Sequence, residues 1–461
     1  MNNTHTRIGQ DALPRRQFLR NALGAIGMPL FLPMSARGAS PQARLNHACI
    51  GVGGMMGFND LQNFLSHPKV RITALCDVDS RHLDKAREAV PDARPYTDWR
   101  ELLDKEGPRL DSVNVTVPDH MHFPIAHQAI RQGHHVYCQK PMCHDVAEVR
   151  ALTEATREAS VVTQLGTHIT ASPGERLALD YLRRGVIGKV KRVILCANRP
   201  GAIESYRLLG PRPAQGQAVP NTLNWDLWLG TAPTRPYAPE IYHPVRWRAW
   251  QDFGTGWSGD IGCHLFDLVW KGLELTAPTK VKARVQQSWQ NSPERRADTW
   301  PQSNHITWIF PKNRHTEGNE LTVEWYDGLF YPPEEIRSLY PGKTYPTESA
   351  MLIGTEGSLL YPLGAGPWLL PRDKFKGITR PQLQERNHYH DFVNACLGGE
   401  KTTCHFLQSG PMTEAILLGT VAARTPGQWL DWEGVGLKIP NNAQAESLLK
   451  RTYREGWRGK G

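Results

Sequence analysis

From residue 45 onward, short apolar runs alternate with longer amphipathic segments. Short unbroken apolar runs indicate buried strands, and apolar positions that recur every three or four residues indicate helices. We predict strands over residues 46–51, 70–76, 112–117, 135–138 and 161–165. We predict helices over residues 58–65, 79–89, 122–133 and 146–160. Because strands and helices alternate, this part of the chain is predicted to form a doubly wound parallel sheet.

After residue 165 the spacing of the elements changes. A predicted helix over 173–184 and a strand over 190–197 precede a passage to about residue 258 that is rich in Pro, Gly and Trp. A helix over 260–275 follows, and then strands over 279–289, 304–310, 320–326 and 350–354. Late helices over 388–397 and 411–423 are expected to pack back on the body, whereas 290–303 and the tail are predicted loops. The fold class is therefore α/β, with a second α/β domain built on a mainly antiparallel sheet.

These patterns divide the chain into a leading segment (1–38), a first domain (45–165), a second domain (166–433) and a tail (434–461). The leading segment contains Pro-Arg-Arg-Gln-Phe-Leu-Arg at 14–20 and an apolar run at 22–34. That run contains two prolines and is too short to span a bilayer core of about 30 Å. It resembles a twin-arginine export signal with cleavage near 36–39, which predicts a periplasmic or secreted protein. The alternative is a disordered basic tail.

Composition narrows the possible partners. Five Arg and one Asp in the first 38 residues account for +4 of the formal net charge of +9. No dense Lys/Arg run follows them, so nucleic-acid binding is not expected. No later segment approaches the length of a membrane span, so no integral membrane segment is expected either. The eight cysteines are scattered and lack metal-ligand spacing; we interpret them as buried apolar residues, with a Cys138–Cys143 disulfide as the alternative. Most of the fifteen Trp lie beyond residue 220, which suits either aromatic walls for sugars or an ordinary core.

A glycine-rich turn follows the first predicted strand. Gly51, Gly53 and Gly54 allow a sharp turn whose N–H groups meet a pyrophosphate at a helix N-terminus, although Met56 stands where a third glycine is usual and Gly57 comes one residue late. Asp77 ends the second strand and fits the ribose diol of NAD. A carboxylate there repels the 2′-phosphate of NADP. The nearby Arg81 would attract that phosphate, so NADP is the alternative cofactor. The alternative for Asp77 is a helix N-cap.

Two further turns fall at the carboxyl edge of the same sheet, where doubly wound folds bind ligands. Thr116 and Pro118 follow the central strand, and His120 or His122 after them either lines the cofactor or has a structural role. Gln139-Lys140-Pro141 ends the next strand. We predict that the turn residues Thr116, Pro118, His122, Gln139 and Lys140 contact the cofactor, with Lys140 beside the nicotinamide and a substrate oxygen. The alternative for Lys140 is an ordinary surface lysine.

The segment Gly259-Asp260-Ile261-Gly262-Cys263-His264-Leu265-Phe266-Asp267 is predicted to be helical. Helical spacing puts Asp260 and His264 one turn apart, with Asp267 near the same face. A carboxylate and an imidazole on one face can present an orienting group and a base to one cavity. The alternative is a surface or helix-end pair.

Together these motifs resemble the glucose–fructose oxidoreductase/inositol dehydrogenase (Gfo/Idh/MocA) family. The likeness covers most of the chain after residue 45, except that Gln139 stands where the family has Glu in Glu-Lys-Pro. It implies a Rossmann domain, a second domain with a large open sheet, a homo-oligomer, and oxidation or reduction of hydroxyls on sugars or polyols. A minority of the family cleaves glycosidic bonds by oxidation, elimination and re-reduction. Export would require the NAD to be tightly bound, because the periplasm has no pool of free cofactor.

We therefore predict hydride transfer between bound NAD (or NADP) and a sugar hydroxyl or ketone. His264 acts as base, Asp260 orients His264 or a second hydroxyl, and Lys140 stabilises the alkoxide. The substrate wall is predicted to include His168, Tyr242, His243, Trp247 and Arg248. No metal is expected. The competing hypotheses are a redox-assisted glycosidase or lyase, and a non-catalytic sugar- or partner-binding protein.

Overall fold

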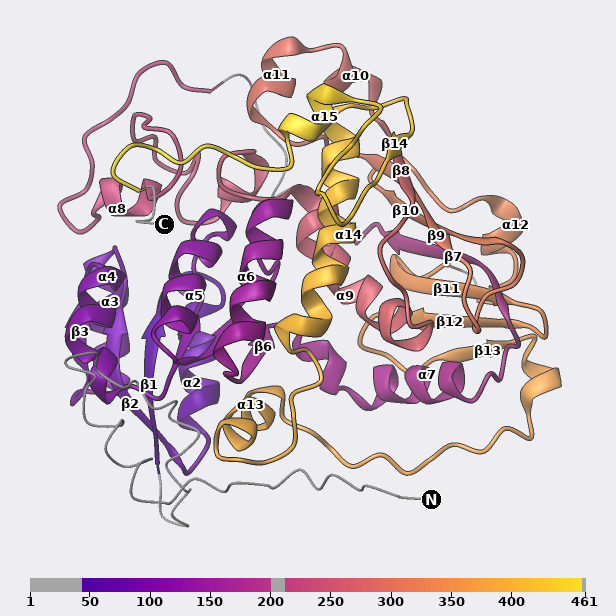
Figure 1. Ribbon diagram of the computed structural model, residues 1–461, viewed down its shortest axis with the longest axis horizontal. Coiled ribbons are helices and arrows are strands. Elements are labelled where there is room, and N and C mark those ends of the chain that lie inside the picture. The colour runs from indigo at the N-terminus through magenta and orange to yellow at the C-terminus, as the bar shows by residue number, and fades with distance from the viewer. Residues whose placement is uncertain (1–43, 200–211, 343, 458–461) are drawn as a thin grey trace, which may run out of the picture. The chain divides into compact units, whose positions relative to one another are not determined.

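The computed structural model describes residues 44–199, 212–342 and 344–457, so the predicted export signal lies outside the described residues. The first sheet has six parallel strands in the order β3-β2-β1-β4-β5-β6 (Figure 1). Its strands are β1 (Leu45–Ile50), β2 (Val70–Cys76), β3 (Arg94–Tyr96), β4 (Ser112–Val115), β5 (His135–Cys138) and β6 (Thr163–Leu165). This order reverses at β1, which confirms the predicted doubly wound parallel sheet.

Helices follow the strands of this sheet: α2 (Gly57–Leu65), α3 (Ser80–Ala89), α4 (Trp99–Glu106), α5 (His122–Arg131) and α6 (Val146–Ala159). Three of them begin at an aspartate, Asp79, Asp98 or Asp145, whose carboxylate accepts a bond from a first-turn N–H. The sequence pattern did not predict β3 or α4. Since β3 is a three-residue edge strand that contains Pro95, it carries no readable alternation.

The second sheet has eight strands in the order β13-β12-β11-β7-β10-β9-β8-β14. Only β7 and β10 pair in parallel, so the prediction of a mainly antiparallel sheet is confirmed. The strands are β7 (Val190–Ala197), β8 (Lys280–Val285), β9 (Asn304–Pro311), β10 (Glu320–Asp327), β11 (Glu348–Gly354), β12 (Ser358–Pro362), β13 (Trp368–Leu370) and β14 (Leu430–Asp431). The accompanying helices are α7 (Pro173–Arg183), α8 (Trp225–Leu229), α9 (Gly256–Gly272), α12 (Glu334–Arg337), α13 (His388–Cys396) and α14 (Phe406–Arg424).

Helix α9 carries the site and is buried almost along its whole length. Small residues let it approach its neighbours, because a Cβ on Gly262 would lie 2.8 Å from Ile416 of α14 and one on Gly272 would lie 2.4 Å from Leu182 of α7. Helix α14 also packs against α6 of the first domain (Figure 1). Helix α9 is therefore packed closely against α7 and α14 and against β7 and β11 of the second sheet.

The structure corrects several predicted boundaries. The strand predicted over 279–289 ends at Val285, and the predicted loop 290–303 holds a helix, α11 (Pro293–Asp298), directly after α10 (Gln287–Gln290). Ser292 caps α11 and proline occupies its first position, signals that the surrounding polar residues concealed. Helix α14 begins five residues before the predicted start and includes Pro411, and the tail contains α15 (Ala443–Ser447).

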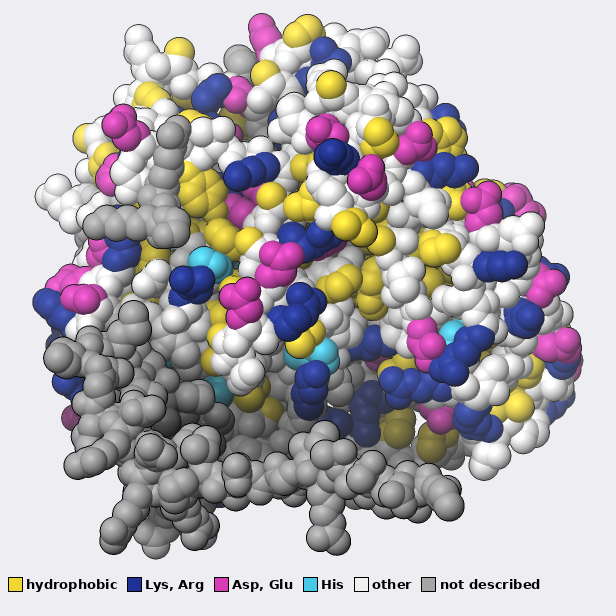
Figure 2. Space-filling model, in the orientation of Figure 1, with side chains coloured by type: hydrophobic (Ala, Val, Ile, Leu, Met, Phe, Trp, Pro, Cys, Tyr) yellow, Lys and Arg dark blue, Asp and Glu magenta, His cyan; other side chains and the backbone are white. Residues whose placement is uncertain are grey.

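The charged side chains, the cysteines and the lengths of the helices each test an expectation from the composition. On the face drawn in Figure 2, acidic and basic side chains are interspersed among apolar ones. All eight cysteines are unpaired, and all but the half-buried Cys396 are buried, which confirms their interpretation as small apolar residues. Within the described ranges, no helix combines the length and apolar character needed to cross a bilayer.

Candidate active site

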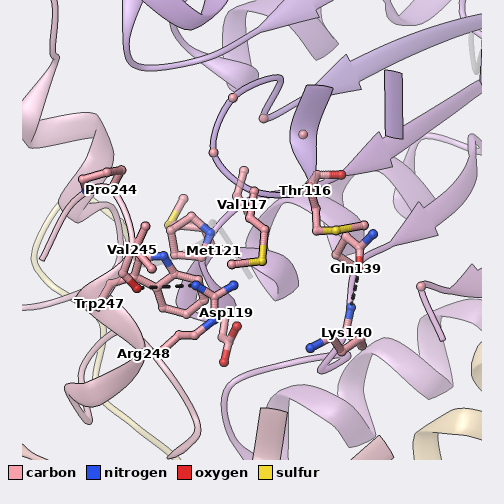
Figure 3. Close-up of a pocket in the computed structure, with 18 of the residues that line it drawn as sticks. Thr116, Val117, Asp119, Met121, Gln139, Lys140, Pro244, Val245, Trp247 and Arg248 are labelled. Carbon is pink, nitrogen blue, oxygen red and sulfur yellow. Dashed lines mark hydrogen bonds between the residues drawn. The ribbon is translucent and has the colours of Figure 1, made fainter. Parts of the chain in front are cut away.

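A cavity of about 430 Å³ opens at the carboxyl edge of β1, β4 and β5. On its other side lie α9 and the segment 243–248, so that Trp247 and Arg248 face Gln139 and Lys140 across the space (Figure 3). Nearly all of the predicted site residues line this cavity: Gly51, Gly53, Gly54, Asp77, Thr116, Pro118, Gln139, Lys140, His168, Trp247, Arg248, Asp260 and His264. Residues more than 200 positions apart in the sequence thus share one space.

The glycine turn is built for close approach of backbone. Gly51 has φ +82°, and a Cβ there would lie 2.1 Å from the carbonyl oxygen of Thr116. A Cβ on Gly57 would lie 2.7 Å from the Gly51 carbonyl oxygen, at the first residue of α2. Gly57 therefore performs the helix-packing task of the third glycine, and the turn is one residue longer than usual. Met56 is thus the extra residue of the turn, and Gly57 takes the structural place of the third glycine.

Asp77 lies beside this turn at the end of β2. Its Oδ2 accepts bonds from the N–H groups of Val52 and Gly53, both at 3.0 Å, and its Oδ1 accepts one from Asp79 at 3.0 Å. Asp79, not Asp77, caps α3, and it also binds Arg81 at 2.5 Å. The carboxylate of Asp77 thus remains at the cavity. Arg81, the cation that would favour the 2′-phosphate of NADP, is paired with Asp79 instead. Glycine turn, helix N-terminus and acidic strand end together fit an NAD dinucleotide.

His82 is a cavity residue that the sequence pattern did not reveal. Its Nδ1 lies 3.3 Å from Asp77 Oδ1, and its ring occupies the space that a Cβ on Gly53 would need. The hydrogen bond with Asp77 raises the pKa of His82, against a smaller opposing effect of burial. An imidazole ring paired with Asp77 therefore stands next to the glycine turn.

Lys140 and Asp260 meet across the cavity. The Lys140 ammonium contacts Asp260 Oδ1 and lies 3.3 Å from the Asp260 carbonyl oxygen, while Arg248 Nε lies 3.4 Å from Oδ2. Arg248 also stacks over the Trp247 ring at 4.2 Å. Burial is the largest single effect on Lys140 and lowers its pKa, but the charge and hydrogen bond of Asp260, together with Cys263, outweigh it, so the net shift of the pKa is upward. Lys140 is accordingly a fixed cation at neutral pH and not a base.

His264 has the opposite character. Burial, followed by the charge of Lys140, lowers its pKa well below the usual 6.5. Its Nδ1 is buried and has no hydrogen-bond partner in the part of the chain that the structure describes, and its ring lies 5.9 Å from that of His168. The imidazole of His264 is therefore neutral beside a fixed ammonium, which is the protonation state that a general base requires.

Asp119, directly after Pro118, is a site residue that the sequence analysis did not single out. In the structure it is a buried cavity residue that accepts bonds from the Thr255 N–H at 3.1 Å and hydroxyl at 3.0 Å. Burial and the charge of Asp260 raise its pKa to about 7. Arg199 and Glu348, 3.4 Å apart, also line the cavity, and no local motif marks them because they come from separate strand ends.

Three predicted residues lie outside the cavity lining. His122 packs between two turns, with its ring nitrogens 2.6 Å from the Pro141 carbonyl and 2.8 Å from that of Val117. Tyr242 belongs to an aromatic cluster with Trp250 and Phe253. Asp267, one turn beyond His264, pairs with Lys271 at 2.5 Å in a separate buried cluster. These positions differ from the expectation because the sequence pattern shows proximity to a turn but not the direction of a side chain.

Comparison with known proteins agrees with this architecture. The N-terminal model of the Gfo/Idh/MocA oxidoreductase family, described as an NAD-binding Rossmann fold, matches residues 45–167. The C-terminal α/β domain model of the same family matches residues 182–304. The structure of the WlbA dehydrogenase from Bordetella pertussis, in complex with NADH and UDP-GlcNAcA, is 16% identical with a TM-score of 0.58, covering 85% of this chain and 98% of that one. At this identity the likeness shows the shared fold.

Two curated relatives match over shorter stretches. Levoglucosan dehydrogenase of Pseudarthrobacter phenanthrenivorans is 25% identical over 37% of this chain, and a glycosyl hydrolase family 109 protein of a Shewanella species is 25% identical over 38%. The matched stretches span 35% and 44% of the length of these relatives. Two matched domain models, the shared fold and the NAD-shaped cradle give one conclusion: the chain belongs to the Gfo/Idh/MocA oxidoreductase family.

Proposed function

We propose that this protein is an NAD-dependent dehydrogenase that acts on a hydroxyl group of a sugar, glycoside or related polyol. The observation that carries the proposal is the convergence of Lys140, Asp260 and His264 on the cavity that also contains the glycine turn and Asp77. A similar stretch of sequence in a levoglucosan dehydrogenase supports a carbohydrate substrate.

In this mechanism the bound NAD supplies the hydride acceptor. His264, kept neutral by its burial, takes the proton of the substrate hydroxyl. Lys140 stabilises the negative charge that develops on the same oxygen, and Asp260 holds the ammonium in place. Trp247, fixed under the Arg248 guanidinium, offers an aromatic face to the apolar side of a sugar ring.

The first experiment is to denature the purified protein and identify the released dinucleotide and its redox state by mass. The protein is then offered a panel of sugars, anhydrosugars and glycosides while NADH absorbance is followed. We expect NAD or NADH to be recovered and at least one carbohydrate to be oxidised. A protein that binds no dinucleotide, even when it is added, would instead support the non-catalytic hypothesis.

Redox-assisted glycoside cleavage is the second candidate. Asp119, a carboxyl group with a pKa raised to about 7 in the same cavity, could pass a proton during elimination next to a transient ketone. The matching stretch of a glycosyl hydrolase family 109 protein supports this candidate. Release of an aglycone without added cofactor and without net NADH would distinguish it from a dehydrogenase.

We also propose that the protein is exported through the twin-arginine route and keeps its NAD tightly bound. A main-chain clamp supports retention: Ser80 N–H donates to the Thr222 carbonyl at 2.8 Å and Asn224 N–H donates to the Val78 carbonyl at 2.9 Å. This clamp ties the segment 220–224 over the β2–α3 turn beside Asp77.

Export is tested by cell fractionation of a variant in which both Arg15 and Arg16 are changed to Lys. We also propose that the protein forms a homo-oligomer, which mass photometry tests.

A further inference from the structure

A buried carboxylate, Asp60, lies in the first turn of α2 behind the cavity wall. Its two oxygens accept bonds from Gln139 Nε2 at 3.1 and 2.9 Å. The Thr116 hydroxyl donates to Oδ2 at 2.7 Å, and the Tyr389 hydroxyl donates to Oδ1 at 2.7 Å. Asn114 in turn donates to Thr116 Oγ1 at 2.8 Å, which directs the Thr116 proton toward Asp60. The network therefore stabilises the ionised form of this carboxyl group.

The partners of Asp60 are all neutral. The titratable groups that interact with it from the elements packed around it are the thiols of Cys49 (β1) and Cys138 (β5) and the phenols of Tyr137 (β5) and Tyr389 (α13). Burial raises the pKa of all four, so they carry no charge at neutral pH. Within the described ranges no salt bridge to Asp60 is formed. Burying a carboxylate without a paired cation costs free energy. A cationic group on a bound ligand would lower that cost.

The topology shows which part of a dinucleotide passes this charge. The two halves of NAD lie on either side of the turn between β1 and α2. Asp77, on the β2 side, would hold the adenosine ribose, which would leave the β4 and β5 side, with Lys140, for the nicotinamide half. Thr116 and Gln139, the two residues that bind Asp60 and line the cavity, lie at the ends of β4 and β5 (Figure 3). Asp60 therefore lies behind the wall on the nicotinamide side.

We propose that Asp60 sets the redox preference of the bound cofactor by favouring the oxidised form. The oxidised nicotinamide ring carries a positive charge that the reduced ring lacks, so a nearby carboxylate stabilises NAD⁺ relative to NADH. Gln139, which stands where the family has Glu, transmits this arrangement to the turn that carries Lys140. Asp60 is a positioning residue, because it acts on the cofactor through its charge and through Gln139 and Thr116.

The test measures the relative affinity for NAD⁺ and NADH, which does not depend on knowing the substrate. The protein is loaded with NADH and titrated with NAD⁺ while the fluorescence of bound NADH is followed. We expect Asp60→Asn to shift the NAD⁺/NADH affinity ratio about tenfold toward NADH, roughly the effect of one charge at about 12 Å with an effective dielectric constant of about 20. For a two-electron couple this is a rise of about 30 mV in the potential of the bound cofactor.

Asp327→Asn is the matched control. Asp327 is a fully buried carboxylate that also has neutral partners, Asn304 and Trp325, but it lies in the second sheet away from the cavity. Its substitution is expected to leave the affinity ratio unchanged. An Asp60→Asn protein that binds both forms in the wild-type ratio would overturn the proposal.

Two further arms keep the proposal testable if Asp60→Asn folds poorly. The double variant Asp60→Asn/Gln139→Glu returns a carboxylate to the network at the other position and should restore the wild-type ratio. A ratio shifted toward NADH contradicts the proposal.

The second arm is a pH titration of the wild type, because burial raises the pKa of Asp60. In the wild type the preference for NAD⁺ should consequently fall as the pH is lowered through that raised pKa, and a ratio that rises instead contradicts the proposal.

Discussion

At the scale of single residues, burial and one ion pair give two basic side chains of the cavity opposite roles. Lys140 keeps its proton because Asp260 compensates its charge, whereas His264 loses its proton because it is buried next to that cation. The sequence analysis predicted both Lys140 and His264 as site residues. Their protonation states depend on distances that only the folded chain defines.

His264→Ala should lower kcat by about 10²- to 10⁴-fold, the usual contribution of a general base. Lys140→Met should have a comparable effect, since it removes the charge that stabilises the developing alkoxide. Both variants should retain NAD, which mass analysis after denaturation checks. His127→Ala, a histidine outside the cavity lining, is the control and should leave kcat unchanged. Full activity of His264→Ala would contradict the assigned base.

Asp119 gives a pH-dependent prediction for stability. Its folded-state pKa of about 7 lies above the usual value near 4, so between these limits the folded protein holds a proton that the unfolded chain has lost. Stability from this group therefore falls as the pH rises from about 4 to about 7. Asp119→Asn should raise the unfolding free energy at pH 8 by at most about 4 kcal/mol and leave it unchanged near pH 4. Urea titrations at the two pH values test this, and an equal effect at both would contradict it.

At the scale of elements, the hydrophobic pattern located long elements well and short ones poorly. The bounds of β2, β5 and β7 agree with the prediction, because each strand is mostly apolar and lies next to a turn. By contrast, β3, β13 and β14 have three residues or fewer, and tertiary pairing, not local pattern, forms them. The cofactor turn was recognised, but the task of Gly57 became clear only from its contact with the Gly51 carbonyl.

Gly57→Ala should prevent α2 from docking closely on β1. The added methyl group would overlap main-chain atoms that cannot move freely, at a cost of about 1–3 kcal/mol. We expect a clearly lower melting temperature and at least about tenfold weaker NAD binding by fluorescence titration. Gly107→Ala is the matched control, since its Cβ would meet only ordinary contacts at 3.5 Å or more. NAD affinity equal to that of wild type would show that Gly57 is not the third glycine of the turn.

At the scale of the whole molecule, the tail predicted as a loop ties distant parts of the chain together. Arg451 binds Glu148 on α6 at 2.7 and 2.8 Å and donates to the His120 carbonyl at 2.6 Å. The Tyr453 hydroxyl also donates to Glu148, at 2.6 Å. These contacts fasten the tail to the first domain close to the turns that line the cavity.

Arg451→Ala should destabilise the fold by about 3–5 kcal/mol, because it leaves the buried carboxylate of Glu148 without its cation. The midpoint of urea unfolding measures the loss. Lys105→Ala removes an ion pair in which both side chains are about half exposed, and should change the midpoint by less than about 1 kcal/mol. Similar effects of the two substitutions would mean that the tail contact contributes little.

The sequence by itself determined the alternating first domain, the mainly antiparallel second sheet and the residue types of the cofactor turn. It could do so because periodicity, glycine and strand-end carboxylates are local signals. Tertiary structure alone decided that His122 and Tyr242 lie outside the cavity lining, that Asp119 is buried within it and that Asp60 is buried behind it. Side-chain direction and desolvation depend on neighbours far along the chain, such as Tyr389 at Asp60 and Thr255 at Asp119. No local pattern carries that information, because these neighbours meet only when α2, α9 and α13 have packed around the two sheets.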